Sequence, residues 1–288
     1  MNLWKGLKWK DLGRSVWHDV KDDHVPNGAA ALAFYMVLAV FPAAIFGLSL
    51  LPYLPIPHLQ QAVMDLVHQA LPSSTADTFA GTVQKIVSQR RGGLLSFGLL
   101  LTIWSASSGL YAVMQQLNVV YEVDERRSFV KARALAIGLT LVFFVLVVGA
   151  LALVIGGGWV QSWMAHHLGW SAALRDFFAV LRWIVILLAL QLALAVVYWA
   201  GPNVKQPFEY FAPGTTFATL GLVLASVLFR VYVQNFGHYD RLYGSLGAII
   251  VLLMWLFVAG WVILLGGEIN ERVENQKGIV HPPRQVRT

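Results

Sequence analysis

The stretch that decides the fold is LGAIIVLLMWLFVAGWVILLGG, residues 246–267. It contains no charged residue, and a helix of this length crosses about 30 Å of hydrocarbon at about 1.5 Å per residue. A second apolar stretch, residues 213–236, precedes it, and the polar turn GHYDR (237–241) lies between the two. The sequence therefore predicts two membrane-spanning helices, at 213–236 and 242–267.

Composition places the whole chain in the membrane class. Of the 288 residues, 57% are hydrophobic and only 12% are charged, against about 25% charged in a typical soluble domain. There is no cysteine, which excludes disulfides, thiol nucleophiles and cysteine metal sites. The net charge of +6 falls mainly between the apolar stretches, where membrane topology and anionic lipid headgroups explain it.

Four further apolar stretches complete the predicted architecture. We expect an all-α polytopic membrane protein with six transmembrane helices at residues 28–54, 94–121, 134–164, 177–200, 213–236 and 242–267. Pro42 lies inside the first helix and should kink it. The run Gly156-Gly157-Gly158 is expected to break the third. Fourteen of the 21 lysines and arginines fall on the side that also holds both termini and five on the other, which predicts cytoplasmic termini.

Three segments lie outside the predicted spans. Residues 1–27 form a polar arm in which apolar residues recur at helical spacing, so it is either an amphipathic helix on the membrane surface or a helix packed on the cytoplasmic loops. The spacing of apolar residues within 58–91 predicts amphipathic helices at the outer surface of the membrane. Residues 271–288 are a polar cytoplasmic tail.

Polar side chains at membrane depth are the candidate functional residues. Arg230 costs about 2.5–3.5 kcal/mol inside a span, so we expect it to face protein or water beside a partner or an anionic ligand. Arg182 could share that site or could extend to the membrane interface. The candidates for a polar cleft are Arg230, Gln234, Ser226, Tyr232, Asp240, Tyr243, Gln115, Gln116, Asn118, Arg182 and Glu268.

Packing is the alternative interpretation of these polar groups. Hydrogen bonds between membrane helices contribute about 0.6 kcal/mol each on average, and for Gln191 and the serines we favour this role. The sequence has no phosphate-binding loop, no nucleophile elbow and no histidine–carboxylate set with metal-ligand spacing. We therefore expect no metal, no cofactor and no enzymatic activity.

Several short motifs, taken together and in order, resemble a known family. They are AAALAFY (29–35) running to Phe41-Pro42, WSAS (104–107) with Leu117-Asn118, Pro213-Gly214, and YGSLGA (243–248) running to GGEIN (266–270). Over residues 14–275 the chain resembles the YihY/BrkB family of bacterial inner-membrane proteins, formerly labelled ribonuclease BN. Gly267 stands where the family pattern has alanine.

The resemblance implies a multi-pass protein of the bacterial cytoplasmic membrane. Members of the family carry the labels ribonuclease, serum-resistance factor and transporter. The sequence does not support the ribonuclease label, because it shows no metal-ligand cluster, no acidic catalytic set and no basic soluble domain. We expect membrane lipids and an anionic lipid or small solute as partners, with no nucleic acid, and a homo-oligomer is compatible with the sequence.

Two hypotheses about function follow. The first is a transporter that moves a small charged or amphiphilic, lipid-like solute through a polar cleft between the spans at 94–121, 213–236 and 242–267. The second is a non-transporting scaffold that supports the cell envelope and docks partners through the outer helices at 58–91. An intramembrane enzyme ranks third, because the predicted topology places Glu268 and Asp240 at opposite faces.

Overall fold

The structure is a computed structural model, described for residues 9–50, 92–168, 172–236 and 246–279. Every regular element within these ranges is an α-helix. Five helical segments are long and apolar enough to cross a membrane: Ser96–Val120, Phe129–Ala150, Asp176–Ala200, Pro213–Val233 and Ile249–Gln276. A further helix contributes the shorter apolar segment Val25–Val40. The predicted class, an all-α polytopic membrane protein, is confirmed.

The helices follow the predicted spans closely. In chain order they are α1 (Trp9–Asp22), α2 (Val25–Leu50), α5 (Gly92–Val120), α6 (Phe129–Leu168), α7 (Ala172–Ala200), α8 (Pro213–Phe236) and α10 (Leu246–Gln276). Helix α8 has the bounds predicted from the sequence, and α2 continues through Pro42. The predicted outer helices at 58–91, together with Asp240 and Tyr243, lie outside the described residues.

Two helix ends differ from the prediction. Helix α6 continues through Gly156, Gly157 and Gly158, because glycine keeps its backbone N–H and costs a helix only about 1 kcal/mol relative to alanine. Helix α10 continues nine residues past Gly267, to Gln276. Its polar last turns remain helical because they pack against α1, a tertiary contact that hydropathy does not register.

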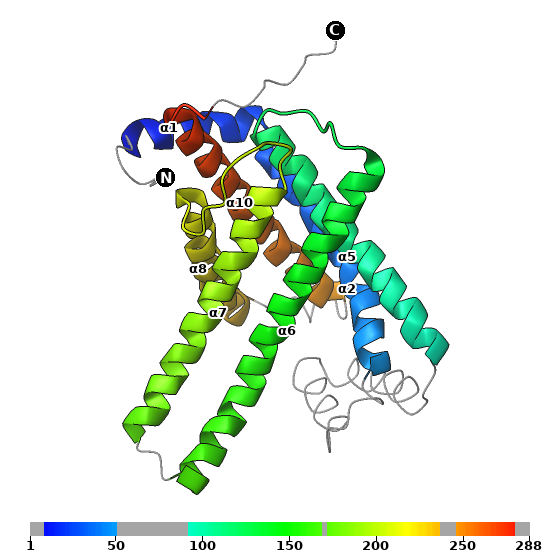
Figure 1. Ribbon diagram of the computed structural model, residues 1–288, viewed down its shortest axis with the longest axis vertical. Helices are drawn as coiled ribbons and strands as arrows, with labels where there is room; N and C mark the ends of the chain where they lie inside the picture. The colour runs from blue at the N-terminus through cyan, green and yellow to red at the C-terminus, as the bar shows by residue number, and fades with distance from the viewer. Residues whose placement is uncertain (1–8, 51–91, 169–171, 237–245, 280–288) are drawn as a thin grey trace.

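Helix α10 is central to the bundle, since it packs against α1, α2, α5 and α8. Helix α5 packs on α2 and α6, and α7 packs on α6 and α8. Figure 1 shows α1 lying across one end of the bundle, together with the last turns of α10 and the connections 121–128 and 201–212. We call this the α1 end. Helix α1, which belongs to the predicted N-terminal arm, packs on α10 and α2.

The apolar core lies toward the α1 end. Leu32, Leu117 and Leu264, from α2, α5 and α10, are buried there together with Val25. By contrast, α6, α7 and α8 carry large exposed apolar side chains along their length, such as those of residues 141–145. A surface of this kind has to face lipid, because water would not tolerate so extended an apolar area.

Glycines allow α8 and α10 to touch through their backbones. A Cβ atom added to Gly214 would lie 1.9 Å from the Gly266 carbonyl oxygen, and one added to Gly266 would lie 2.8 Å from the Gly214 carbonyl oxygen. Helix α10 approaches α2 similarly, since a Cβ on Gly260 would lie 3.2 Å from the Ala29 Cα. Small residues at such crossings let membrane helices pack closely.

Alanine substitutions at three glycines should rank by what the new methyl group meets. Gly214→Ala should lower the free energy of unfolding by about 3 kcal/mol, because two backbones must separate. Gly267→Ala should cost less than about 1 kcal/mol, because the nearest atom, at 2.9 Å, is a methyl carbon at the end of Leu117. Thermal unfolding in detergent measures the differences.

Gly138→Ala is the matched control, since no atom lies within 4 Å of the added methyl group and alanine favours a helix by about 0.5–1 kcal/mol. Equal melting temperatures for the Gly214 and Gly138 variants would contradict the proposed backbone contact.

Candidate functional site

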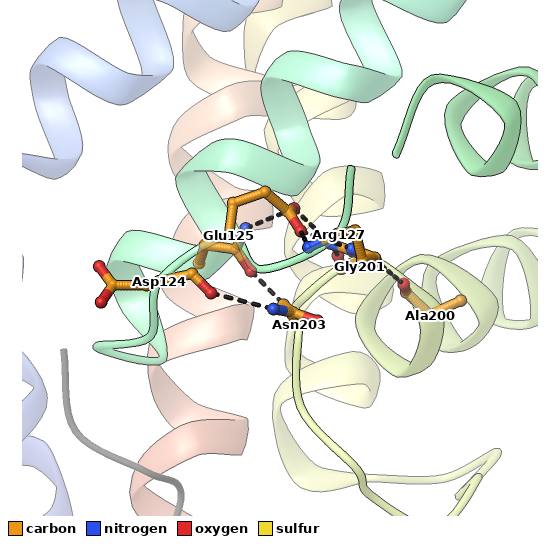
Figure 2. A network of polar contacts seen from close by, with 7 residues as sticks. Asp124, Glu125, Arg127, Ala200, Gly201 and Asn203 are labelled. Atoms are coloured by element: carbon orange, nitrogen blue, oxygen red, sulfur yellow. Dashed lines mark hydrogen bonds and ion pairs between the residues drawn. The ribbon is translucent and has the colours of Figure 1, made fainter. Parts of the chain in front are cut away.

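A hydrogen-bond network joins the connection after α5 to the connection after α7 (Figure 2). The guanidinium of Arg127 donates to both carboxylate oxygens of Glu125, with Nε–Oε1 2.8 Å and Nη2–Oε2 2.7 Å. It also donates to the Ala200 carbonyl at 3.3 Å and the Gly201 carbonyl at 2.8 Å. Arg127 therefore links the two connections and caps the last carbonyls of α7.

Asn118 and Asn203 extend this network into the bundle. The Asn118 amide donates to Glu125 Oε2 at 3.0 Å, and its carbonyl oxygen accepts the Asn203 backbone N–H at 2.7 Å. The Asn203 side chain donates to the Asp124 carbonyl at 3.0 Å. Burial raises the pKa of Glu125, but the hydrogen bonds from Arg127 and Asn118 outweigh burial and hold that pKa below its usual value. Glu125 is therefore an ionised structural group.

A second set of polar contacts joins α7, α8 and α10. Asn270 accepts the Gly214 backbone N–H at 2.8 Å and donates to the Thr215 hydroxyl at 3.3 Å. Gln191 accepts the Thr219 hydroxyl at 2.6 Å and donates to the Tyr210 carbonyl at 2.7 Å. All four of these side chains are buried. Their hydrogen bonds are internal, so Gln191 has the packing role that the sequence favoured.

Glu268 differs from these satisfied groups. Its side chain is 1% exposed, and neither carboxylate oxygen has a hydrogen-bond partner in the described residues. The charges that act on it are the carboxylates of Asp23, Asp19 and Glu271 and the guanidinium of Arg272. A buried, unpartnered carboxylate is costly, and an ionisable group at membrane depth is by default a functional candidate.

Glu268 belongs to a group of acids at the α1 end, which we call the carboxylate cluster: Asp19, Asp23, Glu122, Glu268 and Glu271. Arg272 forms an ion pair with Asp19 and so ties α1 to α10. Its Nε also lies 3.6 Å from Glu271 Oε2. One guanidinium thus faces several carboxylates, which leaves the cluster with excess negative charge when all of them are ionised.

Asp23 responds to this excess charge. Burial, followed by the charges of Glu122 and Asp19, raises the pKa of Asp23 to about 6. Asp23 therefore exchanges its proton close to neutral pH, unlike an aspartate in water.

Two backbone conformations frame the cluster. Within the described residues, the non-glycine residues with positive φ are His24 (51°) and Glu122 (52°). Glu122 ends α5 in a cap where its N–H donates to Val119 and the Val123 N–H donates to Asn118. Glycine is the usual residue at this position, and α10 ends in a similar cap with Gly278 (φ 75°). Helix α5 has a glutamate there instead.

The residues predicted from the sequence separate in the structure. Arg230 is exposed on α8, Ser226 donates to the Leu222 carbonyl at 2.7 Å, and the ring of half-buried Tyr232 lies 6.1 Å from that of Phe229. Fifteen residues separate Arg230 from Thr215, which is about 22 Å along a helix. Arg230 is therefore far along α8 from the α1 end, and the side chain of Gln234 is outside the described residues.

The other predicted residues lie nearer the α1 end or on α7. Gln115 is exposed, Gln116 is half-buried beside Gly28, and Asn118 belongs to the network above. The guanidinium of Arg182 lies 5.8 Å from the Trp183 ring. Of the predicted residues whose side chains the structure describes, only Glu268 lies in the carboxylate cluster.

Sequence reasoning missed the carboxylates whose charges act on Glu268, and it missed one buried arginine. Asp19 and Asp23 are four residues apart, which is one helical face, but nothing local links that face to α10. Arg133, predicted as a loop residue, is buried in α6, where it donates to the Trp104 carbonyl at 2.8 Å and lies 4.0 Å from the Trp104 ring.

Two hollows lie near these groups. A cavity of about 20 Å³ between Tyr121, Tyr198, Asn270 and Glu274 is large enough for one water molecule. A surface groove of about 610 Å³ is lined by Arg127, Trp199, Pro202, Asn203, Lys205 and Gln206, among others. Within the described chain, no group of three or more acidic or histidine side chains could hold a metal ion.

Known proteins similar to this chain include several that are named membrane proteins. The family described as Virulence factor BrkB matches residues 16–287. Ribonuclease-like protein YfkH of Bacillus subtilis is 36% identical over 86% of this chain and 90% of its own length. A UPF0761 membrane protein of Tolumonas auensis is 25% identical, covering 89% of this chain and 82% of its own.

A third relative, from Alkalilimnicola ehrlichii, is also named UPF0761 membrane protein. It is 28% identical, and the match covers 93% of this chain but only 60% of that protein. No solved structure matches this chain.

Arg127→Ala should lower the free energy of unfolding by about 2–3 kcal/mol, because Glu125 and two carbonyls lose a charged donor. The stability of Arg127→Lys should lie between those of the native protein and Arg127→Ala, because a lysine ammonium cannot form the planar pair of hydrogen bonds that the arginine guanidinium forms. Thermal unfolding in detergent measures both. Arg126 is exposed, so Arg126→Ala should stay within about 0.5 kcal/mol of the native protein; an equal effect of both alanine variants would contradict the role of Arg127.

Asp23 should make stability depend on pH. The pKa of Asp23 in the folded protein, about 6, lies above the ordinary value of 3.8. The contribution of Asp23 to the free energy of unfolding is therefore complete below pH 3.8 and is lost as the pH rises through about 6. The melting temperature, followed by tryptophan fluorescence, should fall across that range, and Asp23→Asn should reduce the fall. Asp176→Asn is the control, because Asp176 is an exposed carboxylate on α7. An unchanged pH profile in Asp23→Asn would contradict the assignment.

Proposed function

This chain belongs to the BrkB family of membrane proteins, and from that premise we propose that it is a secondary transporter of the bacterial cytoplasmic membrane. Its solute is a small charged or amphiphilic, lipid-like molecule. No phosphate-binding loop is present in the sequence, so an ion gradient or the gradient of the solute supplies the energy.

Glu268 is the single observation that carries this proposal. Folding leaves its carboxyl buried and without a hydrogen-bond partner, at a cost of several kcal/mol if it is ionised. Neighbouring Asn270, on the same helix, is fully hydrogen-bonded, so the bundle can satisfy a polar side chain at this depth. A costly group that a purely structural bundle would not need is typical of ion-coupled transport.

Other features support a solute pathway near the α1 end. The groove beside the connection 201–206 places Arg127 and Lys205 next to the exposed Trp199 ring. A basic groove with an aromatic side chain suits an anionic head and an apolar body. Arg230 and Arg182 remain proposed contacts for the solute farther along α8 and α7.

We propose no enzymatic activity. The name of the relative YfkH includes the words ribonuclease-like, but the carboxylate cluster is not arranged to hold a metal ion, and the carboxyl of Glu268 is buried. RNA cleavage by purified protein would contradict this part of the proposal.

Transport can be tested with purified protein in liposomes, using fluorescent phosphatidylglycerol and, separately, radiolabelled inorganic phosphate as probes. We expect at least one probe to cross faster than in empty vesicles, and Glu268→Gln to reduce that rate at least tenfold. Asp176→Asn is the matched control, because Asp176 is an exposed carboxylate at the start of α7. Rates equal to those of empty vesicles for both probes contradict transport and favour the envelope scaffold.

A further inference from the structure

The carboxylate cluster has a graded exposure that leads from solvent to the bundle interior. Glu122 is exposed, Asp23 is half-buried and Glu268 is buried. A negative charge on Glu122 repels a negative charge on Asp23, and a negative charge on Asp23 in turn repels one on Glu268. Three carboxyl groups thus follow one another from the surface inward, on the connection after α5, the end of α1 and α10.

We propose that Glu268 and Asp23 are a proton-binding pair that holds one proton, taken up from solvent past Glu122. As the coupling site of the transporter, this assignment rests on the proposed function; as a proton-binding site, it does not. The bond that forms is an O–H on one carboxyl, the proton comes from hydronium at the α1 end, and release reverses the step.

Charge arithmetic favours a proton over a metal or an organic cation. Arg272 is the cation that acts on Glu268, and it is already paired with Asp19 and close to Glu271. Two like charges at 4 Å repel by about 4 kcal/mol at an effective dielectric constant of 20. Ionising both Glu268 and Asp23 would therefore be costly, and one shared proton removes the repulsion. A metal ion would need a set of ligands that the described residues do not form.

The burial of Glu268 supports sharing. Neither Glu268 oxygen has a hydrogen-bond partner in the described residues, and the carboxyl of Asp23 is the largest of the charges that act on it. A carboxyl and a carboxylate can share a proton through a hydrogen bond, whereas two ionised carboxylates cannot.

Glu122 supports the entry route independently. It adopts φ 52° at the end of α5, a conformation that costs a non-glycine residue roughly 1–2 kcal/mol. Glycine would avoid this cost, as Gly278 does at the end of α10. A carboxylate at so unfavourable a backbone position is understandable if its charge serves the cluster.

The other groups that face Glu268 fit one proton-binding pair. From α1 come Asp19 and Asp23, from α10 come Glu271 and Arg272, and Glu122 faces both Asp23 and Glu271. Asp19 is held by Arg272. The Asn275 amide donates to Glu271. Among the cluster members that are not exposed, Glu268 and Asp23 form no ion pair in the described residues.

Infrared difference spectroscopy of the full-length protein in nanodiscs tests the pair without any transport assay. At neutral pH we expect a carbonyl stretching band from a protonated carboxyl group, which disappears when the pH is raised. Glu268→Gln should remove this band, and Asp23→Asn should change the pH at which it disappears. Asp176→Asn should leave both unchanged. A band that survives in Glu268→Gln, or is absent from the native protein, overturns the proposal.

The failure of this inference can be told apart from failure of the proposed function. If solute transport occurs and an imposed pH gradient drives it equally in the native protein and in Glu268→Gln, the transporter stands and Glu268 is overturned as its coupling site. If the band behaves as expected but neither probe is transported, the proton site stands without the transporter. If Glu268→Gln does not fold, Asp23→Asn decides, because an unchanged titration of the band overturns the pair.

Discussion

Lipid offers no hydrogen-bond partner, so every polar group that a membrane bundle buries must be satisfied by the chain itself. This constraint organises the α1 end. Arg127 bonds to Glu125 and to two carbonyls at the end of α7, and Asn270 joins α10 to the start of α8. Glu268 differs from these residues, because both of its carboxylate oxygens are buried without a hydrogen-bond partner in the described residues.

Close backbone packing and buried acids depend on each other here. The glycines that bring α8 against α10 also hold Asn270 within reach of Gly214. Two residues before Asn270, Glu268 projects from the same rigid part of α10. Helices α6 and α7, in contrast, do not pack on α10 as α8 does, and they expose much of their apolar surface.

The fold was predictable from the sequence because hydropathy is a local property. The bounds of α8 are those that its apolar stretch predicts, whereas α10 extends to Gln276 because its last turns pack on α1. The candidate site was less predictable. Arg230 was a candidate because it lies inside an apolar stretch of the sequence, but its side chain is exposed in the structure. The neighbours of Glu268 come from α1, and no spacing rule brings together residues so distant in sequence.

The contact between Asp19 and Arg272 joins positions 253 residues apart. During synthesis on the ribosome, α1 emerges before the described spans, whereas Arg272 lies near the end of the last of them, Ile249–Gln276. Asp19 on α1 therefore cannot pair with Arg272 until the end of α10 has been synthesised. Closure of the α1 end is then a late event in biogenesis, and changes near Trp9–Asp22 should impair assembly after membrane insertion rather than insertion itself.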